Sequence, residues 1–303
     1  MVRFVVGPQD GQAVREVLVR LGADKDAIHE GRVFVGRKRA RSDGEPVREG
    51  DVIQVAAPSR TPPPDVRVLL VTRELAVVDK PAGISTIADQ RGAAHALVAT
   101  LARILGVRAA GLHSTSRLDR DVSGVVVFAR TKAARQRLAR ARVEGAYERH
   151  YVAISAPTPL ERGTWNAPIG RAKDPRLRSV EGPAAIPAMT RFCVCARAPG
   201  GAALLAVAPI TGRTHQIRVH AAHAGAALLG DRAYGGPTRV ALPGGRVIAL
   251  TRIALHAARV VVPDEAGGSV TLEAAVPQEL AALWGDLGGS SDAWELATKC
   301  ALG

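Results

Sequence analysis

The chain has 303 residues, and its 41 lysines and arginines against 28 aspartates and glutamates give a formal net charge of +13. Only six of the basic residues are lysines. Because the planar fork of arginine suits phosphate groups and base edges, nucleic acid is the first partner to expect. A hydrophobic fraction of 47% excludes a mainly disordered basic chain.

Several classes of protein find no support in the sequence. The chain reaches Asp10 before any apolar stretch long enough for a signal peptide, and it lacks the run of about 18 apolar residues that spans a membrane, so we expect a cytoplasmic protein without membrane contact. Neither a G-x-x-x-x-G-K-[ST] loop nor a G-x-G-x-x-G turn is present, so no nucleotide cofactor is expected. Cys193, Cys195 and Cys300 are too few for a disulfide framework, and Cys-x-Cys in an alternating strand is a poor metal pair. A GC-rich genome also enriches arginine, so the charge alone leaves the partner open.

The domain organisation follows from a proline-rich segment at residues 58–65, which predicts an extended linker. The segment separates a small module, residues 1–57, from a larger one, residues 66–287. The tail, residues 288–303, is expected to be poorly ordered, with a helix over residues 293–302 as the alternative.

The small module begins with apolar residues at helical spacing, which predict a helix over residues 13–21. A strand is expected within residues 29–36, and a Gly-Asp turn leads into a last strand at residues 52–55. This order resembles the α-L RNA-binding domain named after a small-subunit ribosomal protein, and a generic small β-module is the alternative. The basic loop between the two strands carries the RNA-binding candidates Arg37, Lys38, Arg39 and Arg41.

The larger module has more predicted strands than helices, and they do not alternate strictly. This pattern predicts an α+β fold with a mixed, largely antiparallel central sheet and flanking helices. The predicted strands are 66–71, 75–78, 125–129, 151–154, 190–196, 203–208 and 270–274. The predicted helices are 93–105, 132–142, 214–224 and 278–284.

A charged loop, residues 116–124, precedes one of the apolar strands and therefore lies at a strand end, where ligands tend to bind. Arg117 and Arg120 flank Asp119 in this loop. Neighbouring cations favour an ionised carboxylate, which a nucleophile or a charge-stabilising group requires. A surface ion-pair cluster is the alternative interpretation.

A second polar segment, residues 211–220, reads Thr-Gly-Arg-Thr-His-Gln-Ile-Arg-Val-His. Thr214 is the expected N-cap of a helix, which would leave backbone N–H groups available to phosphate. The histidines of this region lack the spacing of a His-Glu-x-x-His site, so capping, packing and RNA contacts are expected of them and no metal. Tyr151 starts a strand in a chain with only three tyrosines, and its ring can stack on a base.

Together these motifs resemble the pseudouridine synthases, in particular the branch named RluA, which modifies ribosomal and transfer RNA. Two positions depart from the usual pattern: Ser116 stands where histidine is common, and Val122 stands where threonine is common. The matching motifs are Asp79-Lys-Pro-Ala-Gly83, Arg117-Leu-Asp-Arg-Asp121 with Ser123-Gly124, Tyr151, Thr211-Gly-Arg-Thr-His-Gln-Ile-Arg218, Gly230-Asp-x-x-Tyr-Gly235 and Leu255-His-Ala257.

The resemblance implies a cofactor-independent isomerase that converts uridine in RNA to pseudouridine. Asp119 would be the essential carboxylate, which either attacks the sugar or abstracts the ribose 2′ proton. Arg218 would pair with Asp119 and orient it, and Tyr151 would stack on the base and remove the carbon-5 proton. The implied substrate-binding residues are Ile217 against the uracil, Arg117 in the space of the extruded nucleotide, Leu118, and Arg213 and Lys80 on loops or phosphates.

Large-subunit ribosomal RNA is the expected substrate, because an α-L module accompanies ribosomal members of this family, and transfer RNA is the alternative. A catalytically silent RNA-binding or ribosome-assembly factor of the same fold is a second alternative. A glycosidase with paired carboxylates is a third, but Asp119 and Asp121 are two apart in one loop. We expect a monomer.

Overall fold

The computed structural model describes residues 2–23, 27–28, 32–40, 42–56, 65–87 and 96–302. The chain divides into two compact units, one formed by residues 1–65 and 84–109 and the other by residues 66–83 and 110–303. Of the predicted linker, only Asp65 lies within the described residues, and the RNA-binding candidate Arg41 lies outside them. No helix in the described part of the chain is both long and apolar enough to cross a membrane.

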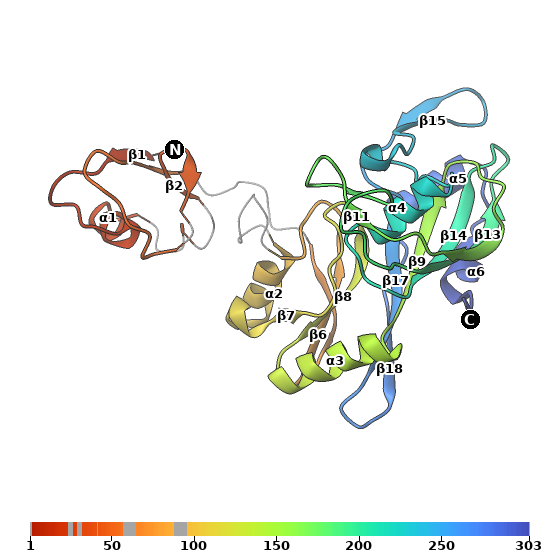
Figure 1. Ribbon diagram of the computed structural model, residues 1–303, viewed down its shortest axis with the longest axis horizontal. Helices are drawn as coiled ribbons and strands as arrows, with labels where there is room; N and C mark the ends of the chain where they lie inside the picture. Colours follow the sequence, from red (N-terminus) through yellow and green to blue (C-terminus); the bar gives the residue numbers. More distant parts are fainter. Residues whose placement is uncertain are drawn as a thin grey trace. The chain divides into compact units, whose positions relative to one another are not determined.

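The first unit contains a small antiparallel sheet of four strands in the order β1-β4-β2-β3. Figure 1 labels its strands β1 and β2 and its helix α1. The predicted helix and the predicted last strand are confirmed, and their buried residues Val17 and Ile53 share one core with Val33. The strand at the N-terminus was not predicted. The elements are β1 (Val2–Val5), α1 (Val14–Arg20), β2 (Val33–Val35), β3 (Lys38–Arg39), β4 (Val52–Val55) and α2 (Leu97–Leu105).

The expected basic loop of this unit is instead a tight hairpin. Lys38 and Arg39 form β3 and pair with β2, so that only Gly36 and Arg37 remain as the turn. Gly36 has φ +60°, the left-handed conformation that two-residue hairpin turns require. Arg37 and Lys38 are exposed, whereas Arg39 lies over the ring of Phe34 at 5.3 Å.

The second unit is built on a ten-stranded sheet in the order β10-β13-β14-β9-β17-β8-β6-β5, with β18 on β17 and β7 on β8. Every neighbouring pair is antiparallel except β17 and β8, which confirms the α+β fold with a mixed, mostly antiparallel sheet. The strands are β5 (Arg67–Val71), β6 (Leu75–Lys80), β7 (His113–Ser114), β8 (Ser123–Ala129), β9 (Glu148–Ser155), β10 (Arg162–Trp165), β13 (Thr190–Arg197), β14 (Ala203–Pro209), β17 (Leu255–Pro263) and β18 (Ser269–Glu273). Two short hairpins pair β11 (Gly170–Arg171) with β12 (Arg178–Ser179) and β15 (Arg239–Ala241) with β16 (Val247–Ala249).

The central strand β17 was not predicted as a strand, although its first residues were quoted as a motif. It lies between β9 and β8, and its parallel contact with β8 requires Gly124. A Cβ at Gly124 would lie 2.2 Å from the carbonyl oxygen of Ala257, and the residue has φ +118°. Glycine is therefore needed where the charged loop enters the sheet.

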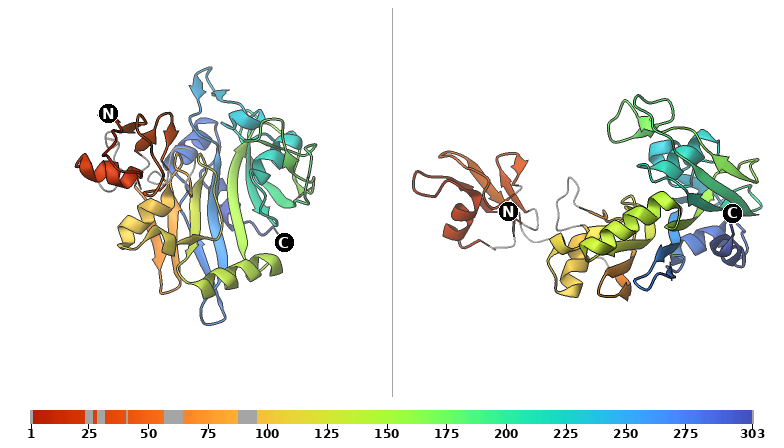
Figure 2. Two further views of the ribbon diagram at one scale, coloured as in Figure 1. Left: turned by 60° about the vertical axis from the view of Figure 1, so that its left-hand side comes forward. Right: turned by 60° about the horizontal axis from the view of Figure 1, so that its bottom comes forward.

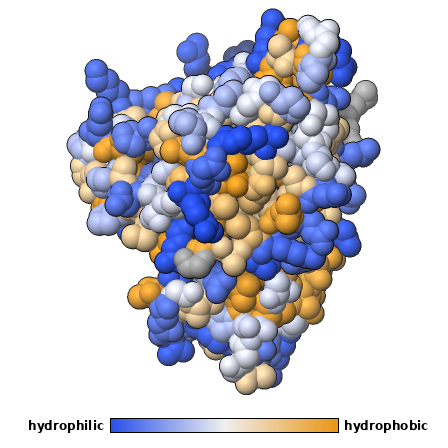
Figure 3. Space-filling model, turned by 90° about the vertical axis from the view of Figure 1, so that its right-hand side faces the viewer, coloured by the Kyte–Doolittle hydropathy of each residue, from blue (hydrophilic) through white to orange (hydrophobic). Residues whose placement is uncertain are grey.

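Helices cover the sheet in two groups (Figure 2). Helix α3 (Lys132–Glu144), capped by the hydroxyl of Thr131, packs its Leu138 on β6, β8 and β17. Helices α5 (Gln278–Asp286) and α6 (Ala293–Lys299) bury Trp284 and Trp294 against β9 and β14. Figure 3 shows the side of the molecule that carries β13, β14 and α6. On this face, apolar areas are surrounded by hydrophilic side chains.

The expectation of a poorly ordered tail was wrong. Residues 293–299 form α6, and Ala293, Trp294 and Ala297 are buried in the same core as Trp284 of α5. The two tryptophan rings meet edge to face with centroids 6.5 Å apart. The burial of these apolar side chains, rather than local helix propensity, orders the tail.

Candidate active site

A cavity of about 300 Å³ lies in the second unit between the loop before β8 and the loop before α4 (Gln216–His223). Arg117, Leu118 and Asp119 line it from the first loop, and α4 adds Ile217 and Arg218. Tyr151 of β9 lines it from the sheet. The fold thus brings the three predicted catalytic residues to one cavity, although Asp119 and Arg218 are 99 positions apart.

Arg218 joins two carboxylates at the wall of this cavity. Its Nη1 donates to Oδ2 of Asp119 at 2.8 Å, while its Nε and Nη2 donate to the two oxygens of Asp231 at 2.7 and 2.8 Å. Asp231 is 1% exposed, whereas the side chain of Asp119 is 26% exposed to the cavity. Burial alone would lower the pKa of Arg218, but the hydrogen bonds and charges of the two carboxylates raise it above its ordinary value. Asp231 therefore fixes the guanidinium, and the guanidinium fixes Asp119.

A second pair of side chains completes the surroundings of Arg218. The ring of Tyr234 lies 4.8 Å from the guanidinium carbon, and its hydroxyl accepts from the backbone N–H of Arg178 at 3.0 Å. The same hydroxyl lies 2.7 Å from Nδ1 of His215, within hydrogen-bond distance. Nε2 of the same ring lies 3.8 Å from Oδ2 of Asp119. Burial lowers the pKa of His215, which favours a neutral ring beside the carboxylate.

Tyr151 reaches the cavity because of the alternation of strand β9. Its neighbours Val152 and Ile154 belong to the core under α5 and α6, so Tyr151 faces the opposite side of the sheet. The residue is 8% exposed, and burial raises the pKa of its phenol to about 12. The hydroxyl is therefore protonated at neutral pH, and the ring presents a mostly apolar wall.

Lys80 was predicted to contact substrate or to steady a loop, and in the structure it holds a loop. It is fully buried, and its ammonium group donates to the carbonyl oxygens of Pro81 at 2.9 Å and Arg120 at 3.1 Å. Burial lowers the pKa of Lys80 to about 7. Two further hydrogen bonds hold the end of this strand. The N–H of Gly83 donates to the carbonyl oxygen of Arg120, and Nε of Arg120 donates to the carbonyl oxygen of Gly83. Lys80 is thus a brace under the backbone next to Asp119 rather than a substrate contact.

The loop before α4 is held by side chains whose roles were not predicted. Gln216 accepts from the N–H of Arg213 at 2.9 Å and from Thr211, and its amide donates to Met189 and Thr190. The buried guanidinium of Arg149 donates to the carbonyl oxygens of Pro209 at 2.7 Å and Thr211 at 2.8 Å. The loop is therefore a fixed wall of the cavity.

The expected N-cap at Thr214 was wrong. The N-cap is His215, which has φ +57° and makes no side-chain cap bond. The N–H of Arg213, just before the helix, donates to the side chain of Gln216 at 2.9 Å. His220 is also structural, since its two ring nitrogens bond to Thr190 at 2.9 Å and to the carbonyl oxygen of Ala167 at 2.8 Å.

The remaining predicted residues lie at the cavity with different exposures. Leu118 and Ile217 are buried in its wall, whereas Arg117 is exposed. Arg213 is exposed and donates to the carbonyl oxygen of Pro187 at 3.0 Å. Of the two departures from the family pattern, Val122 is 2% exposed in the cavity wall and Ser116 accepts from Tyr147 at 3.4 Å.

Behind the Asp119 loop a buried polar chain connects β8 to β17. Nη2 of Arg252 donates to the hydroxyl of Ser123 at 2.6 Å, and the hydroxyl lies 2.8 Å from Nδ1 of His256. Nε2 of His256 donates to the carbonyl oxygen of Ala274 at 3.3 Å, so Nδ1 accepts from Ser123. Burial lowers the pKa of His256 to about 4. The neutral ring is therefore part of the fold that supports the loop.

His256 makes the stability of the protein sensitive to acid. The unfolded histidine has an ordinary pKa of 6.5 and the folded one about 4, so this contribution is complete above pH 6.5 and is lost as the pH falls toward 4. Between pH 7.5 and pH 5 we expect wild type to lose about 2 kcal/mol more unfolding free energy than His256→Gln, which cannot titrate. Urea unfolding at both pH values measures the difference. Equal losses in the two proteins would show that His256 is charged in the fold.

Sequence comparisons with known proteins place the chain in a family. The family model described as RNA pseudouridylate synthase matches residues 74–223. A Bacillus subtilis protein called an uncharacterised RNA pseudouridine synthase is 34% identical over 201 residues, which are 65% of this chain and 63% of that relative. A ribosomal large subunit pseudouridine synthase D from Xanthomonas campestris is 32% identical over 290 residues, which are 90% of this chain and 85% of the relative. The chain belongs to the RNA pseudouridine synthase family.

The pseudouridine synthase fold is also seen in solved structures. The human RNA pseudouridylate synthase domain containing 4 superposes with a TM-score of 0.59 at 22% identity, over 73% of this chain and 93% of that chain. The chain spans just under two thirds of the first Bacillus relative. The cavity is lined by residues of two motifs that carried the resemblance, the one at residues 117–121 and the one at residues 211–218.

Sequence reasoning about the pseudouridine synthase motifs missed the roles of Asp231 and Tyr234. The motif Gly230-Asp-x-x-Tyr-Gly235 contained both, but no charge pattern in the sequence connects them with Arg218. The only signal in the sequence was the Gly230-Asp231 pair, which is typical of a tight turn. The structure shows why glycine is needed there, since Gly230 has φ +78° and a Cβ at this position would lie 1.9 Å from the carbonyl oxygen of Arg252. A buried carboxylate directly after such a turn needs a cationic partner.

Proposed function

We propose that the protein converts uridines of structured RNA to pseudouridine, and that large-subunit ribosomal RNA is its substrate. The observation that supports this most is the carboxylate of Asp119, held at 2.8 Å by Arg218 in a cavity that Tyr151 faces. The isomerisation breaks the bond between ribose and uracil nitrogen, turns the ring and forms a bond from ribose to carbon-5. It needs no redox step and no group donor.

The cavity contains groups that suit such a reaction. Its volume, about 300 Å³, is at the lower end of the range for small-ligand sites, about 300–1,000 Å³, and suits one extruded nucleotide. Asp119 acts on the ribose, as nucleophile or as base for the 2′ proton, with Arg218 holding its orientation. Tyr151 and Ile217 bound the uracil, and the exposed Arg117 occupies the space that the nucleotide leaves.

One comparison supports ribosomal RNA. The relative from Xanthomonas campestris, which aligns with 90% of the chain, is named for the large ribosomal subunit. The first unit presents Arg37 and Lys38 on an exposed hairpin, where they can neutralise phosphates of either RNA class. A net charge of +13 attracts any folded RNA, so it does not separate the two substrate classes.

The proposal is tested by incubating the purified full chain with transcripts that carry tritium at carbon-5 of uridine. Isomerisation releases this tritium to water, and carbodiimide-blocked primer extension then locates the product. Release from a large-subunit ribosomal transcript, and not from transfer RNA transcripts, is expected. Release from transfer RNA alone would overturn the substrate, and release from neither RNA would overturn the activity.

Two substitutions of Tyr151 distinguish stacking on the base from proton transfer. Removal of the carbon-5 proton by Tyr151 requires the phenolate, which the raised pKa of Tyr151 makes a minor form at neutral pH. Tyr151→Phe keeps the ring and removes the hydroxyl, so we expect near-normal RNA binding, with turnover reduced by at least about 100-fold if this minor form carries the proton transfer. Tyr151→Leu removes the ring as well, and binding should weaken by about 1–3 kcal/mol for the lost base stacking. Single-turnover tritium release and filter binding measure the two effects. Unchanged turnover of Tyr151→Phe would restrict the residue to stacking.

The hairpin of the first unit is tested by salt dependence. In the full chain with Arg37→Gln and Lys38→Gln together, two phosphate contacts are lost. We expect weaker RNA binding and a slope of log affinity against log salt that is shallower by about 1.4–1.8. Lys299→Gln, a change at an exposed lysine of α6, is the matched control and should leave the slope unaltered. A slope equal to wild type in the double variant would remove the hairpin from the RNA interface.

A further inference from the structure

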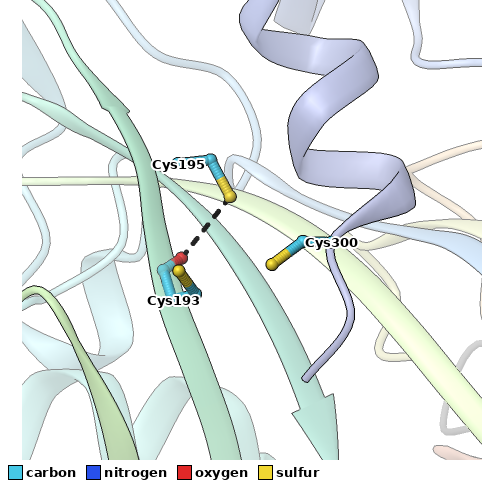
Figure 4. A group of neighbouring side chains, drawn as sticks. All are labelled: Cys193, Cys195 and Cys300. Carbon is cyan, nitrogen blue, oxygen red and sulfur yellow. Dashed lines mark hydrogen bonds between the residues drawn. The ribbon is translucent and has the colours of Figure 1, made fainter. Parts of the chain in front are cut away.

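All three cysteines of the chain meet at one place in the second unit. Cys193 and Cys195 lie on β13, and Cys300 follows the last residue of α6. Their three sulfur atoms lie within 4.8 Å of one another. The sulfur atoms of Cys195 and Cys300 point into the space between the strand and the end of the helix (Figure 4). The chain has no other cysteine, so its whole thiol content is gathered in one cluster.

The cluster exists because the tail docks on the sheet. Cys193 pairs with Ala206 of β14, whereas Cys195 lies inside a register shift between Val194 and Ala196 and has no partner in the β14 register. On its own this pair offers only two ligands, which is why Cys-x-Cys was expected to be a poor metal pair. Burial of Trp294 and Ala297 brings the end of α6 to the same strand, and Arg191 donates to the carbonyl oxygen of Leu302 at 3.4 Å. The third thiol is therefore supplied by tertiary structure.

We propose that Cys193, Cys195 and Cys300 bind one thiophilic metal ion, such as Zn²⁺, through three thiolates. Zn–S bonds of about 2.3 Å in tetrahedral geometry place sulfur atoms about 3.8 Å apart, so the cluster needs to contract by about 1 Å or less. On binding, each thiol releases one proton to solvent, and water fills the fourth position. Three soft sulfur ligands select Zn²⁺ or Cu⁺ over Mg²⁺ and Ca²⁺.

The surroundings favour a metal over a reactive thiol or a disulfide. All three thiols are half-buried, which limits the access of oxidants to them. A bound cation is the agent that deprotonates such thiols. The backbone N–H of Ala206 donates to the sulfur of Cys195, and the positive charge of Arg162 acts on Cys300. Both would stabilise thiolates around a metal. A disulfide would join only two of the three sulfur atoms.

The site is independent of the proposed function. None of the three cysteines lines the cavity of Asp119, and the metal has a structural role, in which it fastens the end of α6 to β13. Metal binding and pseudouridine formation are therefore measured separately, and the failure of one leaves the other standing.

The test uses the purified full chain, reduced and stripped with a chelator, and titrated with Co²⁺ and then with Zn²⁺. Thiolate ligation of Co²⁺ gives a near-ultraviolet charge-transfer band, and no other cysteine contributes to it. We expect a band that saturates at one Co²⁺ per chain and is abolished by one equivalent of Zn²⁺, with a rise in the melting temperature. Absence of the band, or binding weaker than that of the chain denatured in urea, would overturn the proposal.

Variants localise the ion. Cys300→Ser and Cys193→Ser should each weaken Zn²⁺ binding by at least about 100-fold, since loss of even an outer contact to a metal ligand costs 10–100-fold. Lys299→Ser, which changes the exposed residue next to Cys300, is the matched control and should bind Zn²⁺ like wild type. Mass spectrometry of alkylated protein, prepared without reductant, tests the alternative. A disulfide to Cys300 in protein that contains no metal would contradict the proposal and identify a redox pair.

Discussion

Replacement of Asp119 by Asn is expected to abolish pseudouridine formation while the protein stays folded and binds RNA. The variant keeps the size of the side chain but removes the charge that the reaction on the ribose requires, so turnover should fall by at least about 10⁴-fold. Arg218 is not left unpaired, because its Nε and Nη2 still bond to Asp231 at 2.7 and 2.8 Å. The cost in stability should be less than about 1 kcal/mol, since the lost ion pair is partly exposed.

Carbodiimide-blocked primer extension on RNA treated with the Asp119→Asn variant measures the product, and filter binding measures the affinity. The control is Asp121→Asn, which changes the neighbouring exposed carboxylate and should keep substantial turnover. Product at the wild-type level from Asp119→Asn would contradict the assignment. Equal losses in both variants would point to loop charge rather than to one catalytic group.

Replacement of Asp231 by Asn is expected to act through stability first. Asp231 is 1% exposed and bonds to Arg218 through both oxygens, and Asn cannot accept both hydrogen bonds or balance the charge. Removal of one partner from a buried ion pair costs about 3–5 kcal/mol. Activity should fall as well, because the guanidinium that orients Asp119 loses its anchor. Urea denaturation measures the unfolding free energy, and tritium release measures turnover.

The matched control for Asp231 is Asp174→Asn. Asp174 pairs with Arg176 at 2.6 Å on the exposed surface, and we expect no measurable change in stability or turnover. If Asp231→Asn were as stable as Asp174→Asn, the buried pair would not hold Arg218. A stable and fully active Asp231→Asn would exclude it as a positioning residue.

The elements with continuous apolar runs were predictable from local sequence. Strands β8 and β14 and helix α3 lie where period and composition place them. The first half of β17, Leu255-His-Ala-Ala-Arg, shows neither alternation nor an apolar run, although the run Val260-Val261-Val262 that follows was a strand signal that we did not use. Its strand character comes from its position between β9 and β8, where both faces are covered. The helix in the tail was expected only as the alternative, over residues 293–302, and the structure has it at residues 293–299. Its burial depends on a core that is distant in the sequence.

The reacting groups of the site could be predicted from the sequence, but the residues that position them could not. Asp119, Tyr151 and Arg218 carry motifs that point to them individually. Lys80 was expected to contact a loop or a phosphate, but no local pattern identified the carbonyl oxygen of Arg120 as its partner. Asp231 acts by three-dimensional proximity, and no local pattern shows that it places a buried carboxylate against Arg218. Residues that support a site are chosen by burial and hydrogen-bond geometry, which the sequence encodes only through the complete fold.

The central claim is that the cavity of Asp119, Arg218 and Tyr151 isomerises uridine in RNA. The most direct measurement is transcriptome-wide pseudouridine mapping in cells that lack the gene, in cells complemented with the wild-type chain and in cells complemented with Asp119→Asn. We expect one or a few sites in large-subunit ribosomal RNA to disappear on deletion, to return with the wild-type chain and to stay absent with the variant. An unchanged map on deletion, or restoration of the sites by Asp119→Asn, would contradict the claim.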